Sequence, residues 1–212
     1  MSTFFQNLNL EYLLFVIPAV IIALSFHEAA HAFVAYRFGD PTAKAAGRLT
    51  LNPLKHLDIF GTLALIFIHF GWAKPVPINP SYFQGNYRAK MIAVSVAGVS
   101  MNFILCLVAA LFLMLINKGF LPYYEGVILF LTQLLYINAI LIAFNILPIP
   151  PLDGSKVLGE LLPPKYGNKL NEIGRYGFII LIFLALSGLL WKIISPLFQG
   201  IVTFCLTLFG LV

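Results

Sequence analysis

The chain has 212 residues, of which 60% are hydrophobic and only 10% are charged. This composition, with a mean hydropathy of +0.94, excludes an ordinary soluble domain and indicates a polytopic membrane protein. The formal net charge of +5 is interpreted as orientation in the bilayer and attraction to an anionic inner leaflet. No nucleic-acid partner is expected, because no basic stripe with interleaved aromatic residues is present on a soluble face.

Long apolar stretches predict the membrane helices. We expect an all-α polytopic membrane protein with about five spanning helices plus a re-entrant or short hydrophobic segment that contains extended, strand-like elements. The expected spans are residues 10–36, 89–116, 126–147, 177–190 and 194–211. Because no positive charge precedes the first stretch, it is expected to be a retained helix rather than a signal peptide. The chain 1–212 is expected to be one integral-membrane domain, with a core at about 10–160 and a C-terminal helical hairpin at about 168–212.

The positions of lysine and arginine predict the topology. Of the 13 such residues, seven lie in segment 37–90 and four in segment 148–176. The positive-inside rule therefore places both segments in the cytoplasm and the N-terminus outside, in a multi-pass protein of the cell membrane. The short apolar stretch 59–70 is expected to re-enter rather than to cross, because a crossing would carry the later charges of segment 37–90 to the outside.

A metal-binding motif, HEAAH, occupies positions 27–31 inside the first expected span. On a helix, His27 and His31 lie on one face a single turn apart, so both imidazoles can bind one tetrahedral Zn²⁺. Glu28 beside them can act as general base on the water that such a metal activates. The alternative is a chance match on a surface helix. The apolar neighbours disfavour that alternative, because buried histidines and a glutamate need a metal or a cavity to satisfy them.

A third zinc ligand is expected in the sequence NILPIPPLDG, residues 145–154. Its three prolines prevent the helix from continuing, so the chain must unwind before Asp153. One interpretation is that the unwound chain turns Asp153 inward as a ligand at the depth of His31, in the half of the membrane nearer the cytoplasm. The other is a helix that ends in a proline turn, with Asp153 capping the next helix.

Taken together, these motifs resemble those of the intramembrane site-2 protease family of zinc metalloproteases. HEAAH and NILPIPPLDG are similar to the two diagnostic motifs of that family. Segments 47–62 (GRLTLNPLKHLDIFGT) and 71–80 (GWAKPVPINP) are similar to the connecting region of its compact branch, which lacks accessory soluble domains. The resemblance covers about residues 23–160.

The resemblance implies specific roles for residues of this chain. It implies one zinc ion bound by His27, His31 and Asp153, with Glu28 as the base. It also implies that Asn145 orients the substrate or stabilises the oxyanion. Asn102 is implied in a similar role, in the segment AGVSMN (97–102), where Val99 stands in place of the family's usual proline.

The expected function is zinc-dependent endoproteolysis of the transmembrane segments of membrane proteins. A transmembrane substrate must unwind locally before it is cut, and something must receive its freed backbone groups. Segment 73–80 is the candidate, since its prolines force extended geometry and leave an edge that can pair with the substrate. The residues expected to bind substrate there are Lys74, Pro75, Val76 and Pro77. A plain re-entrant loop without substrate contact is the alternative.

Two other functional classes remain open from the residues alone. One is a zinc-binding membrane scaffold or transporter, which would have no need of a carboxylate beside a ligand. The other is a catalytically silent membrane chaperone, which would be expected to have lost Glu28 or a ligand. His56 is interpreted as a loop histidine at the membrane interface and His69 as a structural or gating residue. The partners are the substrate and the lipid bilayer, and the sequence leaves the oligomeric state open.

Overall fold

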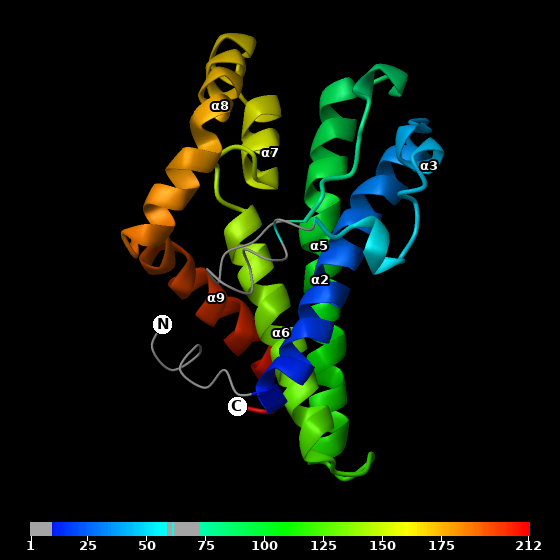
Figure 1. Cartoon of the computed structure of the whole chain (residues 1–212), viewed down its shortest axis with the longest axis vertical. Coiled ribbons are helices and arrows are strands. Elements are labelled where there is room, and N and C mark those ends of the chain that lie inside the picture. The colour runs from blue at the N-terminus through cyan, green and yellow to red at the C-terminus, as the bar shows by residue number, and fades with distance from the viewer. Residues whose placement is uncertain (1–9, 59–60, 62–72) are drawn as a thin grey trace.

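The computed structural model describes residues 10–58, 61 and 73–212. In that part of the chain the regular structure is helical (Figure 1), and an isolated antiparallel bridge joins Leu57 to Ala73. The expected re-entrant stretch 59–70 and His69 lie outside the described residues, apart from Gly61. The helical elements, in chain order, are α2 Leu10–Arg37, α3 Thr42–Ala45, η1 Pro53–Lys55, η2 Pro80–Tyr82, α5 Tyr87–Asn117, α6 Glu125–Asn145, α7 Asp153–Leu161, α8 Pro164–Leu186 and α9 Leu189–Leu208.

Four of the described helices, α2, α5, α6 and α9, are long and apolar enough to cross a membrane. They correspond to the expected spans 10–36, 89–116, 126–147 and 194–211. The expected span 177–190 differs from the structure: α8 begins at Pro164 and ends at Leu186, and the polar start of this helix sets it apart from the apolar four. Gly188 follows with φ +71°, a conformation that ends the helix inside the predicted range.

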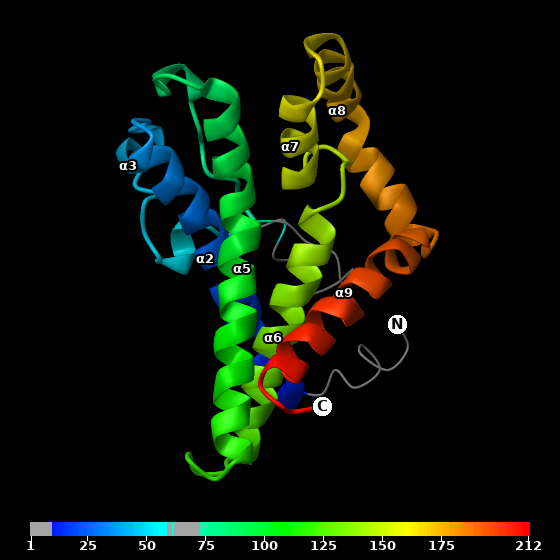
Figure 2. The ribbon, with the colours of Figure 1, turned by 180° about the vertical axis from the view of Figure 1, so that it is seen from behind.

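The long helices alternate in direction along the bundle (Figure 1). As a result, α3, the start of α5 and the connection between α7 and α8 lie at one end of the molecule, and the turn between α5 and α6 lies at the other. Parts of both basic segments therefore share one end: α3 and the start of α5 from one segment, and the α7–α8 connection from the other. Seen from behind, α9 crosses α6 on the side of the bundle away from α2 (Figure 2).

Small residues allow the helices of the core to approach one another closely. Ala19 and Ala23 of α2, Ala109 and Cys106 of α5, and Cys205 of α9 are fully buried in one apolar cluster. Small side chains at helix contacts are typical of membrane bundles, where close van der Waals packing replaces a hydrophobic driving force.

The turn between α6 and α7 is held by glycines at two contacts. A Cβ on Gly154 would overlap the carbonyl oxygen of Ile146, and a Cβ on Gly177 of α8 would overlap that of Pro150. The chain therefore folds back tightly after α6, and α8 packs directly on the proline turn. This packing determines where α7 begins, and α7 begins at Asp153.

Candidate metal centre

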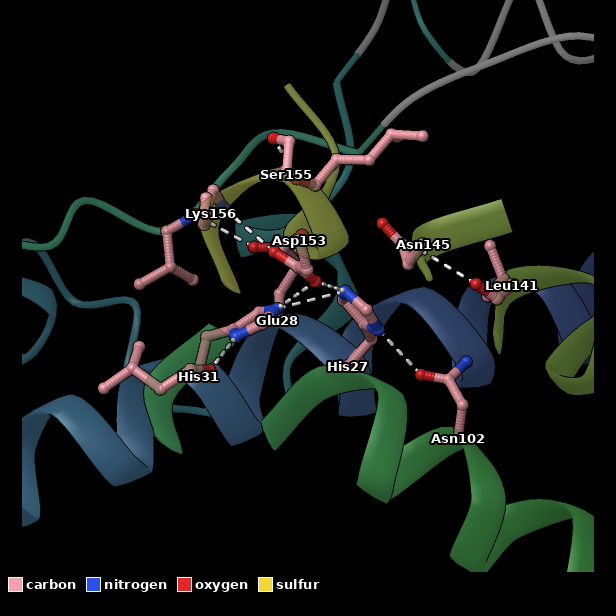
Figure 3. A network of polar contacts seen from close by, with 12 residues as sticks. His27, Glu28, His31, Asn102, Leu141, Asn145, Asp153, Ser155 and Lys156 are labelled. Carbon is pink, nitrogen blue, oxygen red and sulfur yellow. Dashed lines mark hydrogen bonds and ion pairs between the residues drawn. The ribbon is translucent and has the colours of Figure 1, made fainter. Parts of the chain in front are cut away.

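Two histidines of α2 and an aspartate of α7, which is far from them in the sequence, converge between these helices (Figure 3). The Nε2 atoms of His27 and His31 lie 3.1 Å apart on the inner face of α2. Asp153 Oδ2 lies 3.2 Å from His27 Nε2 and 3.0 Å from His31 Nε2. Each of the three residues is only 5% exposed.

The partners of the two histidines determine which ring nitrogens carry protons. His31 Nδ1 lies 2.7 Å from the main-chain carbonyl oxygen of Val94, which can only accept. His27 Nδ1 lies 2.7 Å from Asn102 Oδ1, which also accepts. Both Nδ1 atoms are therefore donors, and in neutral rings both Nε2 atoms present lone pairs to Asp153 Oδ2.

This convergence of acceptors fits a metal ion. Asp153 Oδ2 is buried without a hydrogen-bond donor among the described residues, and the two facing Nε2 lone pairs would repel one another in the absence of a cation. Zinc bonds of about 2.0 Å in a tetrahedron place ligand atoms roughly 3.3 Å apart. The observed separations of 3.0–3.2 Å need only a small outward shift to reach that value. Three protein ligands leave a fourth position open, as in catalytic rather than structural zinc sites.

Asp153 has different partners for its two oxygens. Its Oδ1 accepts a hydrogen bond from Lys156 Nζ at 2.9 Å, one turn further along α7, which leaves Oδ2 for the histidines. Burial opposes ionisation of this carboxyl. The positive charge of Lys156 beside Oδ1 favours the ionised form. Asp153 is therefore a carboxylate, which is the form that binds a metal.

Glu28 lies beside the cluster and contacts segment 73–80. Its Oε2 accepts a hydrogen bond of 2.9 Å from the main-chain N–H of Val76. Two buried charged side chains also anchor this segment. Arg48 Nη2 donates to the Lys74 carbonyl at 2.5 Å, and the Asn79 N–H donates to Asp40 Oδ2 at 2.7 Å. The base candidate and the expected substrate-binding segment are thus in direct contact.

A cavity of about 250 Å³ opens next to the cluster. Part of its wall is formed by Val76, Ile78 and Pro80, alternate residues of segment 73–80, together with His31 and Lys156. The cavity gives a small molecule or a side chain access to one side of the histidine pair.

The remaining expected site residues lie at different places. Asn145 is at the end of α6, where its Nδ2 donates to the Leu141 carbonyl at 3.0 Å (Figure 3). Asn102 is fully buried in α5 under His27, and its Nδ2 donates to Asn138 Oδ1 at 3.0 Å. Pro75 and Pro77 flank Val76, the residue that contacts Glu28. His56, expected at the membrane interface, is fully buried, with Nε2 2.7 Å from the Thr50 carbonyl oxygen.

Several residues that support the centre were missed by the sequence analysis. A Cβ on Gly98 would lie 2.5 Å from His27 Cε1 and 2.5 Å from His31 Nε2, so a glycine is needed where α5 passes the imidazoles. Asn138 and Lys156 contact the centre through Asn102 and Asp153. An asparagine in the apolar run of α6 and a lysine one turn after Asp153 were the available signals.

Comparison with known proteins gives consistent matches. The model of peptidase family M50 matches residues 122–187. The chain is 38% identical to "Putative zinc metalloprotease YwhC" of Bacillus subtilis, over 85% of this chain and 86% of that protein. It is 33% identical to "Putative zinc metalloprotease Rip2" of Mycolicibacterium smegmatis, over 81% of this chain and 66% of that protein. It is 30% identical to "Putative zinc metalloprotease MJ0611" of Methanocaldococcus jannaschii, over 73% of this chain and 75% of that protein. No solved structure matches the chain.

Proposed function

The chain belongs to peptidase family M50, the zinc metalloproteases, and we propose that it cleaves transmembrane segments of membrane proteins inside the bilayer. One observation carries this proposal: the buried cluster of His27, His31 and Asp153 has both histidines on α2, a helix apolar and long enough to span a membrane. A group of metal ligands at that depth is costly unless it has a function.

We assign His27 Nε2, His31 Nε2 and Asp153 Oδ2 as the ligands of one zinc ion. When bound, zinc supplies an acidified water and polarisation of the scissile carbonyl. The residues around it have separate tasks. The Val94 carbonyl and Asn102 keep the imidazoles in the ligating tautomer, and Lys156 keeps the second oxygen of Asp153 engaged.

Glu28 is the proposed general base. It takes a proton from the attacking water and delivers it to the leaving amine, so the peptide bond breaks with no net change in the state of the carboxylate. The Val76 N–H holds one of its oxygens in place and leaves the other for this transfer.

An amide donor is proposed to stabilise the developing oxyanion. Asn145 can do this if its Nδ2 leaves the Leu141 carbonyl, with which it is paired at 3.0 Å. Asn102 is less suited to the same task. Its oxygen accepts from His27 and its amide nitrogen donates to Asn138, so we assign it to the positioning of His27 instead.

The extended segment 73–80 is the proposed receiver of the unwound substrate. Lys74, Pro75, Val76 and Pro77 precede the point where Asp40 anchors Asn79. Backbone groups of this segment would pair with the substrate as an added strand, and the 250 Å³ cavity beside Val76 has room for a substrate side chain.

We propose that the N-terminal end of α2 faces the outside and that the metal cluster lies toward the cytoplasm. The common end of α3, the start of α5 and the α7–α8 connection, which belong to the two basic segments, supports this orientation (Figure 1). The substrate would then be cut in the cytoplasmic half of its transmembrane segment.

A reconstitution assay tests the proposal. The purified protein in liposomes, given a generic single-span substrate, should produce fragments cut within the transmembrane segment. A zinc chelator should stop the reaction, and added zinc should restore it. Zinc binding without any cleavage of several single-span substrates would point instead to a scaffold, a transporter or a chaperone.

A further inference from the structure

We propose that Asn138 of α6 is a positioning residue for the metal ligand His27, acting through Asn102. Neither its sequence context nor the comparisons assign it a role. The inference rests on the proposed metal cluster but not on proteolysis. It is carried by three consecutive hydrogen bonds that link α6, α5 and α2 in the interior of the bundle.

The chain of hydrogen bonds has one allowed direction. Asn138 Nδ2 lies 2.7 Å from the main-chain carbonyl oxygen of Leu134, which can only accept, so the amide nitrogen must face it. The Asn138 oxygen therefore faces Asn102 and accepts from its Nδ2 at 3.0 Å. This leaves the Asn102 oxygen to accept from His27 Nδ1 at 2.7 Å. A fixed carbonyl of α6 thus determines which nitrogen of His27 carries the proton.

The reverse orientation of Asn102 would disable the ligand. If its amide turned over, Nδ2 would face His27 Nδ1, which would then have to accept, and the ring proton would move to Nε2. A protonated Nε2 cannot bind a metal. Asn138 opposes this state, because the turned amide would bring two oxygens together at a position where both asparagines are fully buried and no water is available to separate them.

The arrangement is asymmetric between the two histidines. His31 Nδ1 bonds directly to a main-chain carbonyl, that of Val94, and needs no side chain to set its tautomer. A change at Asn138 should therefore act on His27 and leave His31 in its ligating form. A general loss of packing would not make that distinction.

Two substitutions separate the hydrogen bonds from the volume of the side chain. Asn138→Leu has a similar shape but cannot donate or accept. Asn138→Asp preserves the pattern, because a protonated carboxyl donates to the Leu134 carbonyl and accepts from Asn102. Ser25→Ala is the matched control, since Ser25 Oγ is buried without a hydrogen-bond partner among the described residues and lies outside the chain of amides.

Zinc affinity of the full-length protein in detergent, measured by competition with a chromophoric chelator, should fall 10- to 100-fold in Asn138→Leu. It should stay close to the wild-type value in Asn138→Asp and Ser25→Ala. With ¹⁵N-labelled histidine in the metal-free protein, His27 Nδ1 should carry a proton in the wild type and lose it in part only in Asn138→Leu. His31 should not change.

Three results would overturn the proposal. The first is a folded Asn138→Leu protein with wild-type zinc affinity, and the second is an equal loss of zinc affinity in the Leu and Asp variants. The third needs no variant: a His27 Nδ1 that carries no proton in the metal-free wild type. If the zinc affinity and the protonation of His27 change as expected but no substrate is cut, the role of Asn138 stands and only the proposed proteolysis is disproved.

Discussion

At the scale of single residues, the two oxygens of Asp153 have different partners. Oδ2 faces the histidines and Oδ1 faces Lys156, so the carboxylate is oriented to give one oxygen to a metal. The residues that hold ligands in place lie one contact further out and include a lysine, two asparagines and a main-chain carbonyl. Such partners commonly contribute one to two orders of magnitude to metal affinity.

Replacing Lys156 with methionine should weaken zinc binding by about 10-fold, because Asp153 loses the partner that keeps Oδ1 engaged. The loss should be modest, since the lysine side chain is 45% exposed and water can take its place in part. Lys156→Arg should recover most of the affinity. Lys165→Met, an exposed lysine at the start of α8, is the control. Equal zinc affinity in wild type and Lys156→Met, measured by chelator competition, would contradict this role.

At the scale of elements, the position of α5 against α2 depends on Gly98. An alanine there would place a methyl group 2.5 Å from both imidazoles, where the rings cannot give way without leaving Asn102 and Val94. We expect Gly98→Ala to lower zinc affinity by roughly 100-fold. The neighbouring Ala97 lines a separate cavity of about 680 Å³ between the same helices, so Ala97→Val should bind zinc normally. Zinc content after dialysis distinguishes the two, and full zinc retention in Gly98→Ala would refute the packing argument.

The main-chain N–H of Val76, in segment 73–80, donates a hydrogen bond to Glu28. Val76→Pro removes this donor while keeping the extended geometry that Pro75 and Pro77 already impose. Cleavage of a single-span substrate should fall at least about 10-fold, as expected for a lost hydrogen bond to a carboxylate, with zinc content unchanged. Val76→Ala keeps the N–H and should retain more activity. The reverse order of the two variants would show that the Val76 side chain, and not its N–H, matters.

At the scale of the whole molecule, the expected helical architecture is confirmed for the described residues, and four of their helices, where about five spans were expected, are long and apolar enough to cross a membrane. Four expected spans correspond to described helices because each is a long apolar run. The stretch 177–190 could not be bounded from hydropathy, since the break at Gly188 depends on a backbone conformation rather than on polarity.

The candidate site was predictable to a different degree at each residue. The four-residue spacing of His27 and His31 follows from helix geometry alone. Asp153 needed the proline turn and a family resemblance, because 122 residues separate it from His31. Asn138 and Gly98 were missed because an asparagine or a glycine in an apolar run gives no sign of what lies across the helix interface. Only tertiary packing brings them to the imidazoles.

The arrangement of the helices predicts which connections lie on the same side of the membrane. Single cysteines near Lys44 and near Arg88, in a background without Cys106 and Cys205, should label from the same side of sealed vesicles. A cysteine near Lys118, in the turn at the opposite end, should label from the other side. Opposite labelling of the Lys44 and Arg88 sites would contradict the shared cytoplasmic end and the expectation that segment 59–70 re-enters.

Glu28→Gln tests most directly the proposal that the metal cluster hydrolyses peptide bonds with Glu28 as the base. The substitution keeps the shape of the side chain and leaves His27, His31 and Asp153 unchanged, so zinc should stay bound, whereas His31→Ala should lose it. Cleavage of a membrane-embedded substrate by Glu28→Gln should fall by the roughly 10² to 10⁴ expected when a general base is removed. A Glu28→Gln protein that holds zinc and still cleaves at close to the wild-type rate would contradict the account.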